Sequence, residues 1–253
     1  VRERRAESLT GVPYSYELLN KLRFFKMDLP ALKIINQGGG RLSNDLFQTC
    51  AQYAADTGRK FIATYGSTET TSRMAYLPAG WALQKTGSIG IPLPGCSLIL
   101  VDENGEEITT PHVDGEIVFH GPNVTLGYAE KREDLMRGDE RNGVYYTGDL
   151  AYFDEDGCFY IVGRKSRFVK LFGYRIGLDE TERLIKAQFG IACACVGTDK
   201  NLCIYITERG NEQEIRHLLA KQTNLPQTVF EVRIIEEIPK NDSGKTMYSR
   251  LSI

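Results

Sequence analysis

The sequence predicts a mixed fold in which a partial α/β layer is followed by a small β-barrel-like region and then by a compact α+β unit. Three stretches of different character lead to this expectation. Between residues 13 and 69, apolar strands alternate with amphipathic helices, as in a layer with parallel strands. Between 87 and 162, short alternating strands are separated by Asn-Gly and Asp-Gly turns, which indicate antiparallel hairpins. After residue 167, short strands and helices mix again.

These changes divide the chain into three predicted regions. The first, 1–86, is expected to be part of an α/β subdomain of a large domain, and the second, 87–165, a β-rich subdomain of that same domain. The third, 166–253, is expected to be a small α+β domain. The predicted boundary before the third region lies near residues 165–167.

The first region contains two predicted helices, 13–26 and 43–57. The second of them begins after Ser43, whose hydroxyl can cap the free amides of its first turn. Each helix is followed by an apolar strand that runs into a loop, LKIINQGGG (32–40) and FIATYGSTE (61–69). The first helix is expected to carry three apolar residues on one side, namely Leu18, Leu22 and Phe25.

The later regions contain shorter elements. In the second region the turns DENG (102–105) and DEDG (154–157) predict hairpins. In the third region we expect a strand pair followed by a helix at 179–189, a hairpin with its turn at 198–201, a helix at 211–222 and a final strand at 229–235.

The composition is that of an ordinary soluble globular protein. Of the 253 residues, 42% are hydrophobic and 25% charged, and the net charge of −2 gives no reason to expect nucleic acid as a partner. No apolar stretch approaches the roughly 18 residues of a membrane span. The start VRERRAESLTG lacks the apolar stretch of a secretory signal, and Val1 is expected to be an internal residue of a longer chain.

Six scattered cysteines favour reduced thiols, and hence a cytoplasmic location, over a disulfide framework. Cys193 and Cys195 lie two residues apart in an apolar strand, so their side chains are expected to share one buried face. A metal site there would need further soft ligands, and the three histidines lie far away in the sequence. The pair is therefore interpreted as structural.

Four segments carry residues suited to chemistry. The glycines of GGGRLS (38–43) allow a ligand to approach the backbone closely, because glycine has no Cβ. YGSTET (65–70) presents an aromatic ring, several hydroxyls and Glu69, which can hold a metal ion beside a phosphate. YYTGDL (145–150) is expected to place Asp149 in a tight turn, where it can accept hydrogen bonds from a ribose. PKNDSGK (239–245) ends with Lys245 after a glycine.

In their order and spacing, these segments resemble the adenylate-forming (AMP-binding) superfamily of acyl-CoA synthetases, peptide-synthetase adenylation domains and beetle luciferases. The match includes YGSTE, YTGDL, PKNDSGK and the long segment GRKSRFVKLFGYRIGLDETE (163–182). It runs from about Gly11 to Leu251 and corresponds to the C-terminal half of such enzymes. The resemblance implies a large domain that binds ATP and a carboxylic acid, and a mobile C-terminal domain that swings over it.

The resemblance also implies roles for individual residues in the first step, adenylation. Tyr65, beside Gly66, would stack on adenine, Thr68 would bind the α-phosphate, and Glu69 would coordinate Mg²⁺. Asp149 would hold the ribose hydroxyls together with Arg164, and Lys245 would reach the acid's carboxylate and the α-phosphate. Backbone of the glycine segment would line the adenine and acyl pockets, at Gly38, Gly39 and Gly40. A lysine and a magnesium ion suit this step, because it brings two anions together.

For the second step, the resemblance implies that the small domain rotates about Ser166, two residues after Arg164. Rotation would withdraw Lys245 and bring in the loop at Gly173, which would open a path for the pantetheine thiol of CoA or of a carrier protein. Arg175 would then lie near the nucleotide or the phosphates of the thiol donor. Such hinges absorb a torsion change at very few residues.

The sequence departs from the family in several places. Ser166 stands where Asp or Lys is common, Arg41 where a small apolar residue or proline is common, and Gly177 where an acidic residue is frequent. No Ser/Thr/Gly-rich phosphate loop ending in lysine occurs in the chain. The chain is therefore expected to be a fragment that lacks the N-terminal half of its enzyme and is inactive alone.

The resemblance leaves several functions open. The leading interpretation is an ATP-dependent ligase that joins a small carboxylic acid to CoA through an acyl-adenylate. A free-standing enzyme that loads an acyl or aminoacyl group onto a carrier protein, like the D-alanine–carrier ligases, is the first alternative. A non-catalytic half-enzyme is the second, and a luciferase-like oxygenase is the least favoured.

Overall fold

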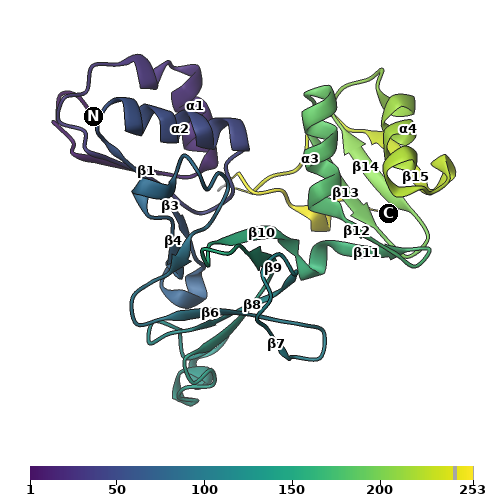
Figure 1. Cartoon of the computed structure of the whole chain (residues 1–253). Coiled ribbons are helices and arrows are strands. Elements are labelled where there is room, and N and C mark those ends of the chain that lie inside the picture. Colours follow the sequence, from purple (N-terminus) through teal and green to yellow (C-terminus); the bar gives the residue numbers. More distant parts are fainter. Residues whose placement is uncertain (242–243, 253) are drawn as a thin grey trace. The chain divides into compact units, whose positions relative to one another are not determined.

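The computed structural model describes residues 1–241 and 244–252, and the chain divides into two compact units, Val1–Val162 and Gly163–Ile253 (Figure 1). This division falls within the last residues of strand β10 (Phe159–Arg164), a few residues before Ser166. In the described part of the chain, no helix has the length and apolar character needed to cross a membrane. The three predicted regions themselves stay predictions.

The first unit begins with a mixed sheet in the strand order β1-β2-β3-β4-β5. The first three strands are parallel, and β4 and β5 continue the sheet in antiparallel fashion. Helices α1 and α2 lie along the parallel strands (Figure 1) and share one apolar core with them. The strands are β1 (Ser8–Gly11), β2 (Ile34–Gln37), β3 (Lys60–Tyr65), β4 (Ala75–Tyr76) and β5 (Ile91–Pro92), and the helices are α1 (Pro13–Lys21) and α2 (Asn44–Asp56). The predicted parallel α/β layer is confirmed.

The helix predicted over 13–26 is wrong after Lys21. Helix α1 ends at Lys21, and Arg23 takes a left-handed conformation with φ of 56°, after which the 3₁₀ turn η1 (Phe24–Lys26) follows. Of the three residues predicted on its apolar side, Leu18 and Leu22 are 46% and 58% exposed, whereas Phe25, in η1, packs against the core. The buried anchor of α1 is instead Tyr16, whose hydroxyl donates to the backbone oxygen of Asn36 on β2.

Helix α2 is confirmed together with its cap. The Ser43 hydroxyl accepts a hydrogen bond from the amide of Leu46, which otherwise lacks a partner in the first turn. The buried side of α2 packs Phe47 edge-to-face against Phe61 of β3, with ring centroids 5.0 Å apart. This contact fixes α2 against the sheet near the start of β3.

The rest of the first unit is a second sheet in the order β10-β9-β8-β6-β7. Its core contains Leu100, Ile117 and Phe119, each at most 1% exposed. The DENG and DEDG hairpins are confirmed, since these turns join β6 to β7 and β9 to β10. The strands not yet bounded are β6 (Ser97–Val101), β7 (Glu107–Ile108), β8 (Gly115–His120) and β9 (Val144–Phe153), and the 3₁₀ turns are η2 (Thr68–Thr70), η3 (Ala79–Trp81) and η4 (Arg132–Met136).

The second unit has a two-stranded sheet, β11-β12, and a three-stranded sheet, β13-β14-β15. Helices α3 and α4 pack with Leu202, Ile204 and Ile206 on one side of the larger sheet. Residues of the C-terminal segment pack with Cys203 and Tyr205 on the other side. The elements are β11 (Phe168–Leu171), β12 (Tyr174–Gly177), α3 (Leu178–Phe189), β13 (Cys193–Gly197), β14 (Leu202–Ile206), α4 (Glu212–Thr223) and β15 (Phe230–Ile234), with η5 (Lys165–Arg167), η6 (Gln227–Val229) and η7 (Tyr248–Arg250).

These elements confirm the predicted helices, hairpin turn and final strand of the third region within one or two residues. The predicted shared face of Cys193 and Cys195 is also confirmed, because both pack against the helix-covered side while Ala194 packs against the other. All six cysteines are free thiols.

Candidate functional site

The glycine segment lies at the carboxyl edge of the parallel strands. It follows β2 directly, while Tyr65 ends the neighbouring parallel strand β3, so both loops start from the same edge of the sheet. A Cβ atom on Gly38 would lie 2.6 Å from Thr64 Oγ1, so only glycine permits this approach between the strands. The Gln37 side-chain Nε2 donates to the backbone oxygen of Gly40 at 2.6 Å and holds the turn closed.

The two motifs that contain Tyr65 and Asp149 meet in the structure. The Tyr65 hydroxyl donates to Asp149 Oδ2 at 2.6 Å. The prediction that Asp149 lies in a tight turn is wrong, since it lies within the ten-residue strand β9. Pairing of β9 with β8 is interrupted there, because Glu116 faces Leu150 whereas Val118 faces Tyr146.

This interruption is a β-bulge formed by Thr147, Gly148 and Asp149. The Thr147 hydroxyl donates to the backbone oxygen of Ile117 and accepts from the amide of Asp149, and Gly148 has φ of 70°. The extra residues re-aim the Asp149 side chain, as bulges near functional sites commonly do.

The loop after β3 holds Glu69 in a short 3₁₀ turn, η2. A Cβ atom on Gly66 would lie 2.2 Å from the backbone oxygen of Ser72, so this tight return also requires glycine. The Ser67 and Thr70 side chains cap the turn, and Thr70 is fully buried. The Glu69 side chain is thereby presented from a constrained backbone.

Glu69 has partners that the sequence interpretation missed. The Tyr128 hydroxyl donates to Glu69 Oε1 at 2.6 Å, and the amide of Thr125 donates to the Glu69 backbone oxygen at 2.8 Å. The Arg141 guanidinium lies over the Tyr128 ring, 4.5 Å from its centroid, and donates to the Thr125 hydroxyl. The Tyr128 hydrogen bond is the main cause that lowers the pKa of Glu69, with a further contribution from the charge of Arg141.

The remaining predicted site residues belong to the second unit. Ser166 lies in η5, the 3₁₀ turn that begins directly after Arg164, the last residue of β10. Gly173, with φ of 85°, forms the two-residue turn between β11 and β12 together with Phe172, whose φ is 51°. The Arg175 guanidinium lies 4.3 Å from the centroid of the Phe168 ring. Lys245 is exposed, and its amide donates to Asn241 Oδ1 at 2.9 Å.

The donor set suits a magnesium ion that is shared with a nucleotide. Among residues 1–241 and 244–252, no group of three or more His, Cys, Asp or Glu side chains is arranged to hold a metal ion. Mg²⁺, however, is commonly held by one or two carboxylates while the phosphates of the substrate and water supply the other oxygens. The Glu69 carboxylate fits this kind of site, and the Tyr128 hydrogen bond lowers its pKa further.

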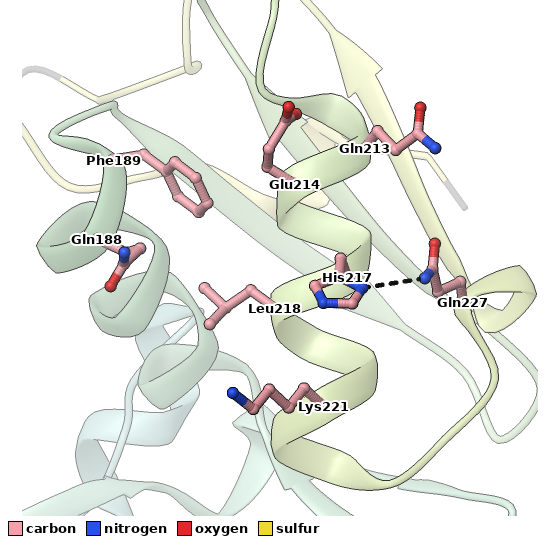
Figure 2. Close-up of a pocket in the computed structure, with 8 residues that line it drawn as sticks. All are labelled: Gln188, Phe189, Gln213, Glu214, His217, Leu218, Lys221 and Gln227. Atoms are coloured by element: carbon pink, nitrogen blue, oxygen red, sulfur yellow. Dashed lines mark hydrogen bonds between the residues drawn. The ribbon is translucent and has the colours of Figure 1, made fainter.

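One cavity lies in the second unit, away from these residues. It has a volume of about 600 Å³ and lies between α3 and α4 in the second unit, with Phe189 and Leu218 between the helices (Figure 2). On its α4 side, a ring nitrogen of His217 is 3.4 Å from the Gln227 side-chain nitrogen. None of the predicted site residues lines this cavity.

The glycine segment, the Tyr65–Asp149 pair and Glu69 all lie in the first unit, and sequence comparison identifies the family of this unit. Residues 1–129 match the family model described as AMP-binding enzyme. The chain therefore belongs to the AMP-binding, adenylate-forming family.

Within this family, the chain is similar to ligases of one kind. The chain is 34% identical to a 2-succinylbenzoate–CoA ligase of Bacillus cereus (strain AH820) over 229 residues, which are 87% of this chain and 46% of the relative. It is 35% identical to the same kind of ligase of Bacillus anthracis (strain A0248) over 222 residues, or 85% and 45% of the two chains. The chain thus spans about half the length of these relatives.

Solved structures give the same result for the fold. The chain matches the O-succinylbenzoate coenzyme A synthetase of Bacillus subtilis in complex with AMP with a TM-score of 0.79 and 25% identity, covering 99% of this chain and 52% of that one. The same synthetase in complex with ATP and a magnesium ion matches with a TM-score of 0.74 and 24% identity, covering 98% and 52%.

Proposed function

We propose that this chain is the C-terminal half of an AMP-forming acid–thiol ligase. The observation that carries the proposal is its kinship, at 34–35% identity over 85–87% of its length, with ligases that join 2-succinylbenzoate to CoA. The reaction has two steps. The carboxylate attacks the α-phosphorus of ATP, which forms the acyl-adenylate and expels pyrophosphate, and a thiol then displaces AMP to form the thioester.

Residues of the first unit would bind the nucleotide. The backbone at Gly38, Gly39 and Gly40 is open to close approach, and Tyr65 would stack on adenine while Asp149 accepts from the ribose hydroxyls. The Tyr65–Asp149 hydrogen bond supports this assignment, because it fixes the ring and the carboxylate relative to each other. The Thr68 hydroxyl would donate to the α-phosphate.

Glu69 would hold a magnesium ion, which when bound neutralises phosphate charge during attack by the carboxylate. Tyr128 and Arg141 would keep Glu69 ionised and oriented toward that task. Lys245 would place a positive charge between the acid and the α-phosphate in adenylation.

The second unit would change position between the two steps, with Ser166 as the pivot. Lys245 would act in adenylation, and the Gly173 turn and Arg175 would replace it when the thiol attacks. Arg164 would support the ribose together with Asp149. The thiol would belong to CoA, as in the curated relatives, or to the pantetheine of a carrier protein as the alternative.

Pyrophosphate release by the intact ligase, in which this chain is joined to its upstream half, tests the proposal. A panel of carboxylic acids headed by 2-succinylbenzoate would be assayed with ATP and Mg²⁺, first without thiol and then with CoA or a phosphopantetheinylated carrier. We expect acid-dependent pyrophosphate release and CoA thioester formation. Thioester formed only on the carrier would favour the carrier-loading alternative. No release with any acid would support the non-catalytic half-enzyme.

The isolated 253-residue chain provides a second test. Because its sequence contains no phosphate loop to bind the β- and γ-phosphates, we expect no acid-dependent pyrophosphate release from it. Release above background would contradict the proposed dependence on the upstream half.

A further inference from the structure

Arg167, the residue after the proposed pivot, is buried at the centre of the second unit. Only 9% of it is exposed. Its Nε donates to Asp179 Oδ1 at 2.7 Å, its Nη1 to the backbone oxygen of Cys195 at 2.7 Å, and its Nη2 to Glu182 Oε1 at 2.5 Å. These three bonds tie η5 to helix α3 and to strand β13.

Glu182 extends this network to the C-terminal segment. Its Oε1 also accepts the amide of Cys195 at 2.7 Å, and its Oε2 accepts the Tyr248 hydroxyl at 3.0 Å. The Tyr248 ring lies against the Arg167 guanidinium, with 3.6 Å from the guanidinium carbon to the ring centroid. Tyr248 is therefore held twice, through its hydroxyl and through its ring.

Tyr248 follows Lys245 by three residues on the returning arm of a hairpin. Lys240 and Thr246 pair in antiparallel fashion, and the amide of Met247 donates to the backbone oxygen of Pro239 at 2.8 Å. The amide of Asn241 donates to the backbone oxygen of Lys245 at 2.9 Å. These bonds link the position of Lys245 to the anchored base of the hairpin.

We propose that Arg167, Glu182 and Tyr248 are positioning residues that lock the Lys245 hairpin to the residue beside the pivot. The inference rests on the proposed function, because it takes Lys245 as the residue that acts in adenylation. Rotation at Ser166 then carries Lys245 as part of one rigid body and not as the tip of a flexible tail. The network is sensitive to substitution, because removal of one charged partner leaves the other as an uncompensated buried charge.

Hydrogen exchange of the 253-residue chain tests the lock independently of activity. Tyr248→Phe deletes the hydroxyl and keeps the ring, so the bond to Glu182 is lost while stacking on Arg167 is retained. We expect exchange of the amides of residues 244–252 to speed up about tenfold, the effect of losing one hydrogen bond to a charged group. Amides of α4 should be unchanged, as should all amides in Tyr14→Phe, a variant of a tyrosine that is 67% exposed. Unchanged exchange in 244–252 would overturn the inference.

Kinetics of the intact ligase test the consequence for catalysis. We expect Tyr248→Phe to lower kcat of adenylation about fivefold to tenfold with KM for ATP unchanged. A misplaced lysine stabilises the transition state less well but does not change the binding of ATP. Thioester formation from supplied acyl-adenylate should change less than twofold. If Lys245→Ala abolishes adenylation while Tyr248→Phe leaves it intact, the positioning role is refuted. If Lys245→Ala itself has no effect, the proposed function of Lys245 fails, and hydrogen exchange still decides the lock.

Discussion

The Tyr65 hydroxyl donates a hydrogen bond to the Asp149 carboxylate at 2.6 Å, across 84 positions of sequence. Tyr65 ends a strand of the parallel layer, and Asp149 lies in the bulge of the antiparallel sheet. The bond therefore joins the two sheets of the first unit at the proposed nucleotide site.

Tyr65→Phe should lower the free energy of unfolding of the first unit by about 1–2 kcal/mol, as expected for a part-buried hydrogen bond to a charged group. Thermal or denaturant unfolding would measure the loss. Tyr146→Phe is the matched control and should have no effect, because Tyr146 lies on β9, the strand of Asp149, and is 62% exposed. Equal stability of the two variants would mean that the Tyr65–Asp149 bond does not hold the sheets together in solution.

Gly66→Ala should destabilise the loop that carries Glu69. The new Cβ would meet the backbone oxygen of Ser72 at 2.2 Å, so the loop must shift, and overpacking of this kind costs about 1–3 kcal/mol. Gly80→Ala is the control, because a Cβ there has nothing within 4 Å. Denaturant unfolding compares the two, and an unfolding midpoint of Gly66→Ala equal to that of Gly80→Ala would contradict the close approach.

Tyr128→Phe should raise the pKa of Glu69. The Tyr128 hydrogen bond lowers the pKa of this carboxyl, so the contact stabilises the fold above the ordinary pKa of glutamate and is lost as the pH falls through the lowered value. NMR titration of the Glu69 side-chain carboxyl carbon would follow both proteins. A titration curve that the substitution does not move would show that Tyr128 leaves the charge of Glu69 unaffected.

Lys245→Ala in the intact ligase should lower the rate of adenylation by about two to four orders of magnitude, a range typical of removing a charged partner of the transition state. Thioester formation from preformed acyl-adenylate should be affected much less, because Lys245 is withdrawn in that step. Separate assays of the two steps measure the difference. A similar fall in both would remove the support for alternation of the small domain.

Ser166→Pro should separate the two steps by trapping one orientation of the second unit. Proline fixes φ near −65° and removes a backbone donor, so only one orientation can accommodate it. One step should fail in the intact ligase while the other persists. Retention of both would place the pivot outside η5 or exclude the rotation.

The elements that the sequence predicted well are those with a strong local signal. Helix α2 has a serine cap and a clear apolar period, and the hairpin turns of the second sheet carry Asn-Gly or Asp-Gly. The break of α1 at Arg23 has no such signal, because neither glycine nor proline occurs there and an arginine takes the left-handed conformation. Local pattern therefore located most elements and missed this break.

The site residues also divide into those with a local sequence signal and those without one. Tyr65, Glu69 and Asp149 stand in motifs, whereas Tyr128 lies 59 positions from Glu69, its hydrogen-bonding partner, and belongs to no motif that the sequence interpretation used. The bulge at Asp149 also needs the partner strand to be known, since a bulge is a mismatch between two strands. Tertiary contacts of this kind do not follow from the spacing of residues along one segment.

The packing of the C-terminal segment against the sheet of the second unit has a consequence for biosynthesis. One side of the β13-β14-β15 sheet is covered by α3 and α4, but the other is closed by Ile238, Tyr248 and Leu251. The nascent second unit keeps an open apolar face until residues 248–251 are translated. The segment that bears Lys245 is thus also the one that ends the unit's exposure to chaperones and to aggregation.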